Sequence, residues 1–362
     1  MRATVLTSVP GRVEIADVPV DAPGPGEVLV RTAACGLCHS DLLPVTGALS
    51  PPVPLVLGHE AAGDVEAVGP GVVDFAPGDR VVACMSQYCG TCGACARGET
   101  TLCERRDRPP LVREAGRAPR LGTADAPVGQ WLNIAGMAER FLVHERAVVK
   151  VAPSLPVDVA ALLGCAVLTG FGTVVNAARL APGETIAVVG CGGVGLAAVA
   201  TARMAGAARI IAVDPAAGAL ELAATLGATD LIDPAGTDAV KAVRTMTGGV
   251  DHAVEAIGRP DTMRQVVDMV RPGGSSYLVG LAGPDVEMSI NPFRTVWYQR
   301  TIRGVLMGAN QFRRDIPRIA ALYLAGRLPI DRLISAHIDL DDAPAALDEL
   351  RTGATGRTVV TF

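Results

Sequence analysis

The chain has 362 residues, of which 49% are hydrophobic, and its 32 basic and 37 acidic residues give a formal net charge of −5. At roughly 100 to 200 residues per domain, this length predicts two domains, each with its own hydrophobic core. The mildly acidic balance lacks the basic field that proteins use to attract nucleic acids, so no DNA or RNA partner is expected.

Nine cysteines are present, and residues 1–20 lack the basic-then-apolar pattern of a secretory signal. We therefore expect a cytoplasmic protein whose clustered cysteines bind metal rather than form disulfides. The longest apolar run, 186–202, is long enough to raise the question of a membrane span. Because it contains four glycines within six positions, we interpret it as a buried strand–helix unit and expect no membrane association.

Short β-rich runs separated by proline and glycine occupy the first part of the chain, at 26–34, 61–68, 80–84 and 138–143. This spacing predicts an antiparallel, barrel-like domain. Between its strands, the stretch 104–130 holds six arginines and four acids, which indicates an ordinary solvated loop. An anionic substrate such as a thiol adduct is the alternative partner for these arginines.

From about residue 156, alanine-rich helical segments alternate with short apolar runs. Helices are predicted at 194–205 and 217–226, and strands at 186–190, 210–214, 231–233, 253–257, 277–280 and 302–306. Such alternation predicts a doubly wound α/β sheet. A helix at 317–325 and extended segments at 333–338 and 357–362 follow. This tail is too short to form a domain, so we expect residues 307–362 to return to the first one.

A glycine-rich motif follows the first strand of the α/β part and opens a helix. In this context G-x-G-x-x-G indicates a dinucleotide site, where the pyrophosphate rests on the helix N-terminus. An acid at the end of the next strand can bind the ribose hydroxyls and repel a 2′-phosphate, which favours NAD over NADP. The residues concerned are Gly190, Gly192, Gly193, Val194, Gly195 and Asp214.

Four cysteines lie within fifteen residues, in the spacing C-x2-C-x2-C-x7-C: Cys89, Cys92, Cys95 and Cys103. Four thiolates can surround one tetrahedral zinc and leave no open position, which predicts a structural metal in a lobe at about 85–105. An iron–sulfur cluster is the alternative, because it also takes four thiolates.

A second set is dispersed along the chain: Cys38, His59 and Cys165. Two thiolates, an imidazole and an open fourth position make a catalytic zinc site. Spacing alone does not establish this set, and a buried structural Cys165 is the alternative. Cys35 to His39 also matches C-x-x-C-H, the pattern of covalent haem attachment.

Taken together, the motifs GPGEVLV, GLCHSDLL, LGHEAAGDVEAVGPGV, LLGCAVLTGFG, VVGCGGVG and GRTVVTF resemble zinc-dependent alcohol dehydrogenases of the medium-chain dehydrogenase/reductase superfamily. The likeness is near the class III, thiol-dependent formaldehyde dehydrogenase branch. It implies a GroES-like catalytic domain at 1–166, a Rossmann NAD-binding domain at 167–306 and the returning segment at 307–362. It also implies two zinc ions per chain, one catalytic and one structural.

The resemblance assigns roles to individual residues. Cys38, His59 and Cys165 bind the catalytic zinc, Glu60 lies behind it, Asp41 orients the histidine, and Ser40 takes the alcohol proton. His39 and Arg357 contact the cofactor pyrophosphate, and Thr169 contacts the nicotinamide side. The apolar residues that line the pocket are Leu49, Met85, Trp131 and Leu306, which suit a primary aliphatic or aromatic alcohol.

Two positions depart from the family pattern. Leu43 stands where a complete proton relay has histidine, and Ala219 stands where many NAD-dependent members have a lysine that holds the ribose. Three alternatives remain open: a glutathione- or mycothiol-dependent formaldehyde dehydrogenase, an enzyme that retains NAD and recycles it with an external acceptor, and a non-catalytic binding or redox-sensing module. The resemblance further implies a homodimer or homotetramer joined through residues 288–308.

Overall fold

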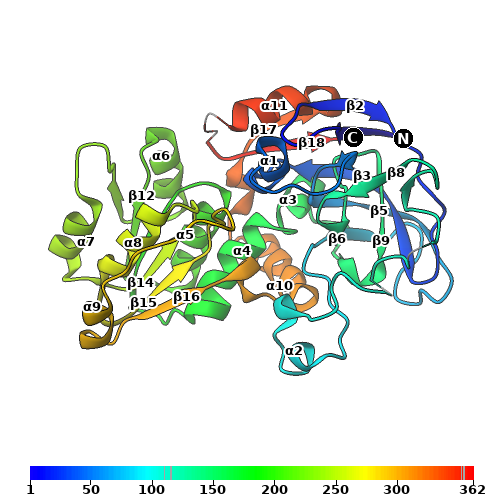
Figure 1. Ribbon diagram of the computed structural model, residues 1–362. Helices are drawn as coiled ribbons and strands as arrows, with labels where there is room; N and C mark the ends of the chain where they lie inside the picture. Colours follow the sequence, from blue (N-terminus) through cyan, green and yellow to red (C-terminus); the bar gives the residue numbers. More distant parts are fainter. Residues whose placement is uncertain (110, 115, 352, 354) are drawn as a thin grey trace. The chain divides into compact units, whose positions relative to one another are not determined.

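The computed structural model describes residues 1–109, 111–114, 116–351, 353 and 355–362. These residues form two compact units. The first comprises residues 1–166, 310–324 and 334–362, and the second comprises residues 167–309 and 325–333. The fold is mixed α/β, with the β-rich sheets in the first unit and a fully parallel sheet in the second (Figure 1).

The first unit contains two sheets. One has the strand order β2-β1-β4-β8-β7, and the other has the order β10-β6-β5-β3-β18-β17 with β9 also paired to β3. Most pairs are antiparallel, as the sequence predicts, but β4 pairs with β8 and β17 with β18 in parallel. The strands are β1 (Arg2–Leu6), β2 (Val13–Asp17), β3 (Glu27–Gly36), β4 (Leu55–Val56), β5 (Glu60–Val68), β6 (Arg80–Ala83), β7 (Leu121–Gly122), β8 (Pro127–Gln130), β9 (Arg140–His144), β10 (Val148–Lys150), β17 (Ile334–Asp339) and β18 (Arg357–Thr361).

Apolar side chains of these strands form one large core cluster, which includes Val30, Leu57 and Phe141. The long strand β3 is buried over most of its length because it pairs with β5, β9 and β18. The helices of this unit are α1 (His39–Thr46), α2 (Gly93–Ala96), α3 (Val157–Leu162), α10 (Phe312–Leu324) and α11 (Ala343–Leu350). Short 3₁₀ turns cover Thr100–Leu102, Trp131–Asn133, Glu145–Ala147 and Leu340–Asp342.

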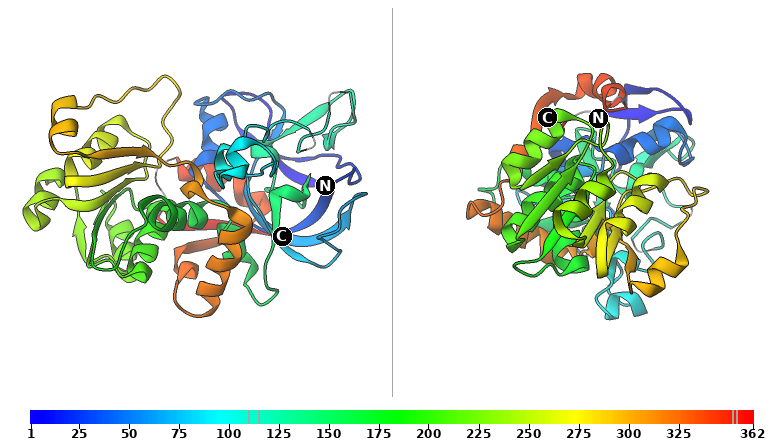
Figure 2. Two further views of the ribbon diagram at one scale, coloured as in Figure 1. Left: turned by 90° about the horizontal axis from the view of Figure 1, so that it is seen from below. Right: turned by 90° about the vertical axis from the view of Figure 1, so that its left-hand side faces the viewer.

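The second unit contains a six-stranded sheet in the order β13-β12-β11-β14-β15-β16. Every neighbouring pair is parallel, and the order reverses between β11 and β14. The right-hand view of Figure 2 shows its green and yellow strands side by side. This is the doubly wound order of dinucleotide-binding sheets. The strands are β11 (Thr185–Val189), β12 (Arg209–Val213), β13 (Asp230–Ile232), β14 (Val250–Glu255), β15 (Val270–Leu278) and β16 (Thr301–Gly304).

Helices of the second unit form two groups. One packs α5 on β11 and β12 with α6 beside it, and the other packs α8 on β14 and β15 with α7 beside it. Because crossovers between parallel strands are right-handed, the two directions of winding put these groups on opposite faces. The helices are α4 (Ala166–Gly172), which starts at the last residue of the first unit, α5 (Gly193–Ala205), α6 (Ala217–Leu226), α7 (Ala239–Thr247), α8 (Pro260–Met269) and α9 (Pro292–Trp297). A π-helical segment covers Thr173–Ala178, and 3₁₀ turns cover Leu306–Ala309 and Ile330–Leu333.

The tail differs from the expectation that all of residues 307–362 return to the first unit, since residues 307–309 belong to the second unit. Residues 325–333 also belong to the second unit, because the turn at Ile330–Leu333 packs against α5 and α6 and fully buries Ile330 and Leu333. Helix α10 begins at Phe312, so Pro317 lies inside it rather than at its start. The apolar run 186–202 forms β11 and most of α5, and no helix among the described residues is long and apolar enough to cross a membrane.

Candidate functional site

The first unit brings four dispersed metal-binding side chains together. The ligand atoms of Cys38, His59, Glu60 and Cys165 all lie within 4.8 Å of one another, and all four residues are buried. Cys38 directly precedes α1, His59 directly precedes β5, and Cys165 directly precedes α4. Each residue therefore stands at the end of a regular element, where the sheet and helices fix its backbone position.

Asp41 connects two of these segments. Its Oδ2 accepts a hydrogen bond from the Cys38 amide at 3.1 Å, which caps the start of α1. Its Oδ1 lies 3.0 Å from Nδ1 of His59 and also accepts the Gly58 amide at 3.2 Å. Such a carboxylate sets the tautomer and orientation of a metal-binding imidazole. Asp41 therefore holds Nδ1 and directs Nε2 of His59 away from itself.

The residues fit a zinc ion. Nε2 of His59 is buried and has no hydrogen-bond partner among the described residues, which is costly unless something binds it. The pKa of Cys38 lies well below its usual value because the Cys165 thiol donates a hydrogen bond to it and the cation of Arg357 is near. A buried imidazole beside a stabilised thiolate is a donor set that zinc prefers.

Glu60 and Arg357 form a buried pair beside this set. Nη2 of Arg357 lies 3.3 Å from Oε1 of Glu60 and 3.7 Å from the sulfur of Cys38, and its Nη1 donates to the Leu37 carbonyl at 2.7 Å. Burial raises the pKa of Glu60 to about 8, although Arg357 opposes the shift. Arg357 thus contacts the dispersed set directly, a placement that sequence reasoning did not anticipate.

The remaining sequence-predicted residues of the first unit lie in α1, in the main apolar cluster or against it. His39 is exposed and Ser40 half-buried in the first turn of α1, while Leu43 packs against the main apolar cluster. Trp131 belongs to that cluster with 5% exposure, and Leu49 and Met85 pack against it. Leu306 lies in the second unit and is 40% exposed.

The four clustered cysteines also converge. The sulfurs of Cys89, Cys92, Cys95 and Cys103 lie within 4.8 Å of one another, around the short helix α2. The pKa of Cys89 falls to about 6 because the Thr91 and Cys92 amides donate hydrogen bonds to its sulfur. Amide donors of this kind stabilise thiolates, so the backbone is arranged for a metal. The lobe is tied to the start of α10 by Thr100 Oγ1, which donates to the Asn310 carbonyl at 2.7 Å.

In the second unit, the glycine motif joins β11 to α5. Gly190 has a φ of 93°, which only glycine adopts readily, and a Cβ on Gly195 would lie 1.8 Å from the Gly190 oxygen. A Cβ on Gly192 would meet no atom within 4 Å. This open space lies at the start of α5, whose first amides have no partner within the helix. An anionic group such as a pyrophosphate fits there.

Asp214 faces the glycine motif. Its Oδ2 accepts the Cys191 amide at 2.7 Å and its Oδ1 accepts the Ala216 amide at 2.9 Å. Each oxygen keeps a further lone pair for a ligand hydroxyl. Thr169 is buried elsewhere in this unit, and its hydroxyl lies 3.6 Å from the sulfur of Met307.

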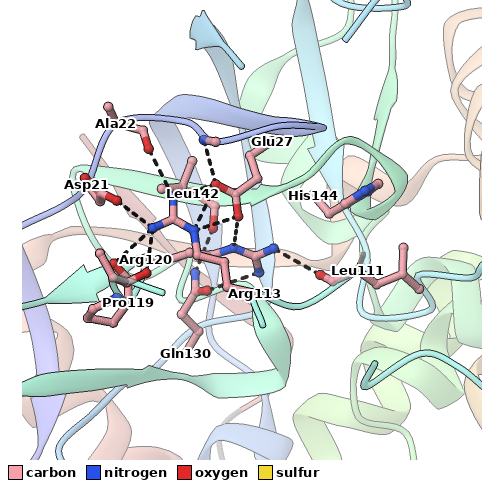
Figure 3. Close-up of polar contacts among 12 residues, drawn as sticks. Asp21, Ala22, Glu27, Leu111, Arg113, Pro119, Arg120, Gln130, Leu142 and His144 are labelled. Carbon is pink, nitrogen blue, oxygen red and sulfur yellow. Dashed lines mark hydrogen bonds and ion pairs between the residues drawn. The ribbon is translucent and has the colours of Figure 1, made fainter. Parts of the chain in front are cut away.

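Sequence reasoning missed a buried ion-pair network in the first unit. Glu27, at the start of β3, accepts hydrogen bonds from Arg113 at 2.6 Å and from Arg120 at 2.7 Å (Figure 3). Arg113 also binds Asp21, and Arg120 is only 7% exposed. The interpretation of 104–130 as a solvated loop is therefore wrong for these two arginines. Both are engaged by acids of the protein, and the only sequence signal was their excess in this stretch.

Comparisons with known proteins agree with this geometry. An alcohol dehydrogenase GroES-like domain matches residues 24–153, and a zinc-binding dehydrogenase domain matches residues 193–321. A putative alcohol dehydrogenase D of Mycobacterium tuberculosis is 36% identical over 366 aligned positions, which cover 99% of this chain and 98% of the relative. An NDMA-dependent alcohol dehydrogenase of Amycolatopsis methanolica is 35% identical, also over 99% of this chain and 98% of the relative.

Solved structures share the whole fold. A zinc-binding-domain alcohol dehydrogenase from Burkholderia ambifaria has a TM-score of 0.94 at 35% identity, over 100% of this chain and 98% of the other. Benzyl alcohol dehydrogenase from Acinetobacter calcoaceticus has a TM-score of 0.93 at 31% identity, over 100% and 99%. A zinc-binding dehydrogenase from Sinorhizobium meliloti bound to NADP has a TM-score of 0.83 at 28% identity, over the same shares. The chain therefore belongs to the zinc-dependent alcohol dehydrogenases of the medium-chain dehydrogenase/reductase superfamily.

Proposed function

We propose that the enzyme oxidises a primary aliphatic or aromatic alcohol with NAD, using one zinc at Cys38, His59 and Cys165. A second zinc, at the four-cysteine lobe, has a structural role. The observation that carries the proposal is the buried Nε2 of His59, which lacks a hydrogen-bond partner among the described residues, in a histidine with a ring nitrogen within 4.8 Å of both sulfurs. GroES-like alcohol dehydrogenases of the same fold support it.

The chain's own residues divide the work. Zinc, when bound, supplies the charge that lowers the pKa of an alcohol oxygen, and NAD accepts the hydride. Asp41 holds the imidazole of His59 in the ligating orientation. Ser40, half-buried in the first turn of α1, takes the alcohol proton. Because Leu43 cannot accept it, the route of the proton from Ser40 to solvent needs another residue, a water chain or the cofactor ribose.

The choice of NAD rests on Asp214. Its carboxylate lies beside the Cys191 amide of the glycine motif, where a 2′-phosphate would meet like charge. His39, Thr169 and Arg357 are the further cofactor contacts in this proposal. The solved relative bound to NADP makes a direct comparison of the two cofactors necessary. Asp214→Gly is expected to raise kcat/KM with NADP relative to NAD by on the order of tenfold, because it removes this repulsion.

A substrate panel tests the proposed reaction. Purified enzyme is given aliphatic and aromatic primary alcohols and a polyol, with NAD and with NADP, and NADH or NADPH absorbance is followed in both directions. The proposal expects turnover of the apolar primary alcohols with NAD, since the residues that the family resemblance assigns to the alcohol pocket are all apolar. Preference for a polyol, or for NADP, would contradict it.

A second candidate keeps NAD bound and recycles it with an external acceptor. The NDMA-dependent alcohol dehydrogenase of Amycolatopsis methanolica favours it, through that relative's name. Under this alternative, desalted enzyme would retain NAD and turn over an alcohol with NDMA but without added cofactor. If the desalted enzyme contains no cofactor and needs added NAD for turnover, this second candidate is excluded and the first candidate stands.

The enzyme is further proposed to be a cytoplasmic homo-oligomer. The nine cysteines form no disulfide among the described residues, which suits a reducing compartment. Phe293, Val296 and Trp297 are 66%, 77% and 69% exposed in α9, the helix that precedes the edge strand β16 in the chain. A second copy would cover this apolar segment within 288–308. Sedimentation velocity should show a dimer or tetramer, and a stable monomer would contradict it.

A further inference from the structure

The turn that follows β8 is held in a strained conformation. Leu132, Asn133 and Ala135 have φ values of 52°, 61° and 60°. This left-handed region is unfavourable for residues with a Cβ, although asparagine tolerates it better than leucine or alanine. Such strain persists only where surrounding contacts impose it, and it gathers at functional sites.

The strained turn is attached to the segment that carries His59. Strand β8 enters the turn beside β4, which lies just before Leu57. On leaving the turn, the Gly136 amide donates to the Gly58 carbonyl at 2.8 Å, and the Met137 amide donates to the Leu57 carbonyl at 3.0 Å. A Cβ on Gly58 would lie 2.3 Å from the Met137 nitrogen. The segment that follows the turn is therefore tightly packed against Leu57 and Gly58, the two residues before His59.

Gln130 closes this turn with its side-chain amide. Nε2 donates to the carbonyl of Ile134 at 3.1 Å and to that of Leu142 at 2.9 Å, so one side chain spans the turn and joins it to β9. Oε1 accepts from Nη1 of Arg120 at 3.5 Å, and Arg120 is itself held by Glu27 (Figure 3). Gln130 thus makes side-chain hydrogen bonds that close the strained turn and join it to β9.

We propose that Gln130 is a positioning residue that determines alcohol specificity, because it fixes the indole of Trp131 on the wall of the alcohol site. Trp131 directly follows Gln130, is 5% exposed, and shares its apolar cluster with Leu49 and Met85. The inference rests on the proposed function, which places Trp131 in the pocket. Without the amide, the turn relaxes and the indole of Trp131 moves. Large alcohols then lose their contact with this indole, whereas small alcohols do not contact it in either case.

Kinetics of Gln130→Met test this role, since methionine keeps the length of the side chain but donates no hydrogen bond. The ratio of kcat/KM for benzyl alcohol to that for ethanol is expected to fall by on the order of tenfold, within the range for misplaced site residues. Gln265→Met, which changes a half-buried glutamine of α8, should leave the ratio unchanged. An equal loss for both alcohols, or no loss, would overturn the proposal.

A glycine substitution tests the strain itself. Glycine adopts positive φ without a Cβ penalty, so Ala135→Gly added to Gln130→Met should restore most of the alcohol ratio. Failure of this rescue would mean that Gln130 does not act through the turn. If Gln130→Met does not fold, Gln130→Glu replaces it, because it keeps an acceptor for Arg120 but loses both amide donations.

Fluorescence gives a readout that needs no turnover. The chain has two tryptophans, so Trp297→Phe leaves Trp131 as the sole reporter. In that background, Gln130→Met should increase acrylamide quenching several-fold and shift the emission to the red. Unchanged quenching would contradict the positioning role. If the parent enzyme oxidises no alcohol, the proposed function fails, while quenching still shows whether Gln130 orders the turn.

Discussion

The two sulfur-rich sites of the first unit are assembled in opposite ways. All four cysteines of the lobe lie in one fifteen-residue stretch, which begins at Cys89 and ends at Cys103. Cys38, His59 and Cys165 come from three distant segments, each at the end of a regular element. The zinc proposed for the lobe can therefore organise it locally, whereas the dispersed set exists only after the sheets and helices have formed.

The two sites also differ in the groups that surround their ligand atoms. The dispersed set is completely buried beside the Glu60–Arg357 pair, and Asp41 holds its histidine. The sulfurs of the lobe are held mainly by backbone amides, such as those that donate to Cys89 and Cys103. Charged neighbours can tune an ion that reacts, while backbone amides suit an ion that only holds the peptide together. Because the two sites share no residue, a substitution can disrupt one site and leave the other intact.

The largest effect is expected from Cys38→Ala. It removes one of the proposed ligands of the reacting metal, and a bound metal supplies several kcal/mol of transition-state stabilisation. Hydride transfer should fall by at least about 10³-fold. Stopped-flow absorbance of NADH at saturating alcohol measures it. A rate within tenfold of the parent would show that the dispersed set is not the reaction centre.

Asp41→Asn should have the next largest effect. The amide keeps the shape but loses the charge that favours Nε2 of His59 as a ligand, and partners of metal ligands contribute 10–100-fold to affinity or activity. Titration with a chromophoric chelator should show one of two zinc ions bound about 10–100-fold more weakly. Equal weakening of both ions would contradict independent sites.

Cys103→Ala removes one sulfur of the four-cysteine lobe and leaves the dispersed set unchanged. The lobe should lose its zinc and become sensitive to proteases. The initial rate per folded chain should fall only several-fold, because no lobe cysteine belongs to the dispersed set. Limited proteolysis beside initial-rate assays measures both properties. Loss of activity as complete as in Cys38→Ala would mean that the lobe takes part in the chemistry.

Glu27→Gln should affect stability but not the rate at pH 7. Burial alone would raise the pKa of Glu27, but hydrogen bonds from Arg113 and Arg120 outweigh it and lower the pKa from 4.5 to about 2. Because the folded pKa is the lower one, this stabilisation is complete above pH 4.5 and is lost as the pH falls towards 2. Breaking such a buried network should cost about 3 kcal/mol at pH 7. Urea unfolding at pH 7 and pH 3 should show the variant and parent converging in acid, and a constant difference would refute it.

Much of this arrangement could be predicted from the sequence where the signal is local. Five of the six parallel strands of the second unit begin within three residues of their predicted starts, and β15 begins seven residues early. The strands β11, β12 and β14 are the buried ones, so their apolar runs give the strongest signal. The helix at 217–226 begins and ends where its periodicity does. The glycine motif adopts its turn because Gly190 and Gly195 admit no side chain.

Other features depend on tertiary contacts that periodicity does not encode. Pro317 reads as a helix start, yet α10 begins at Phe312. Glu27 and Arg120 are far apart in sequence, so their charge excess gave no indication that they pair in the interior. The role proposed for Gln130 was likewise invisible, because left-handed backbone at Leu132 and Ala135 carries no glycine signal.

The most direct test of the account is a metal count on the fully loaded parent and on Cys38→Ala, by inductively coupled plasma mass spectrometry with protein quantified by amino-acid analysis. The account predicts two zinc ions per chain in the parent. It predicts one in Cys38→Ala, with the lobe still resistant to proteases and hydride transfer lost. One zinc per parent chain, or two in a Cys38→Ala variant that has lost activity, would contradict two metals with separate roles.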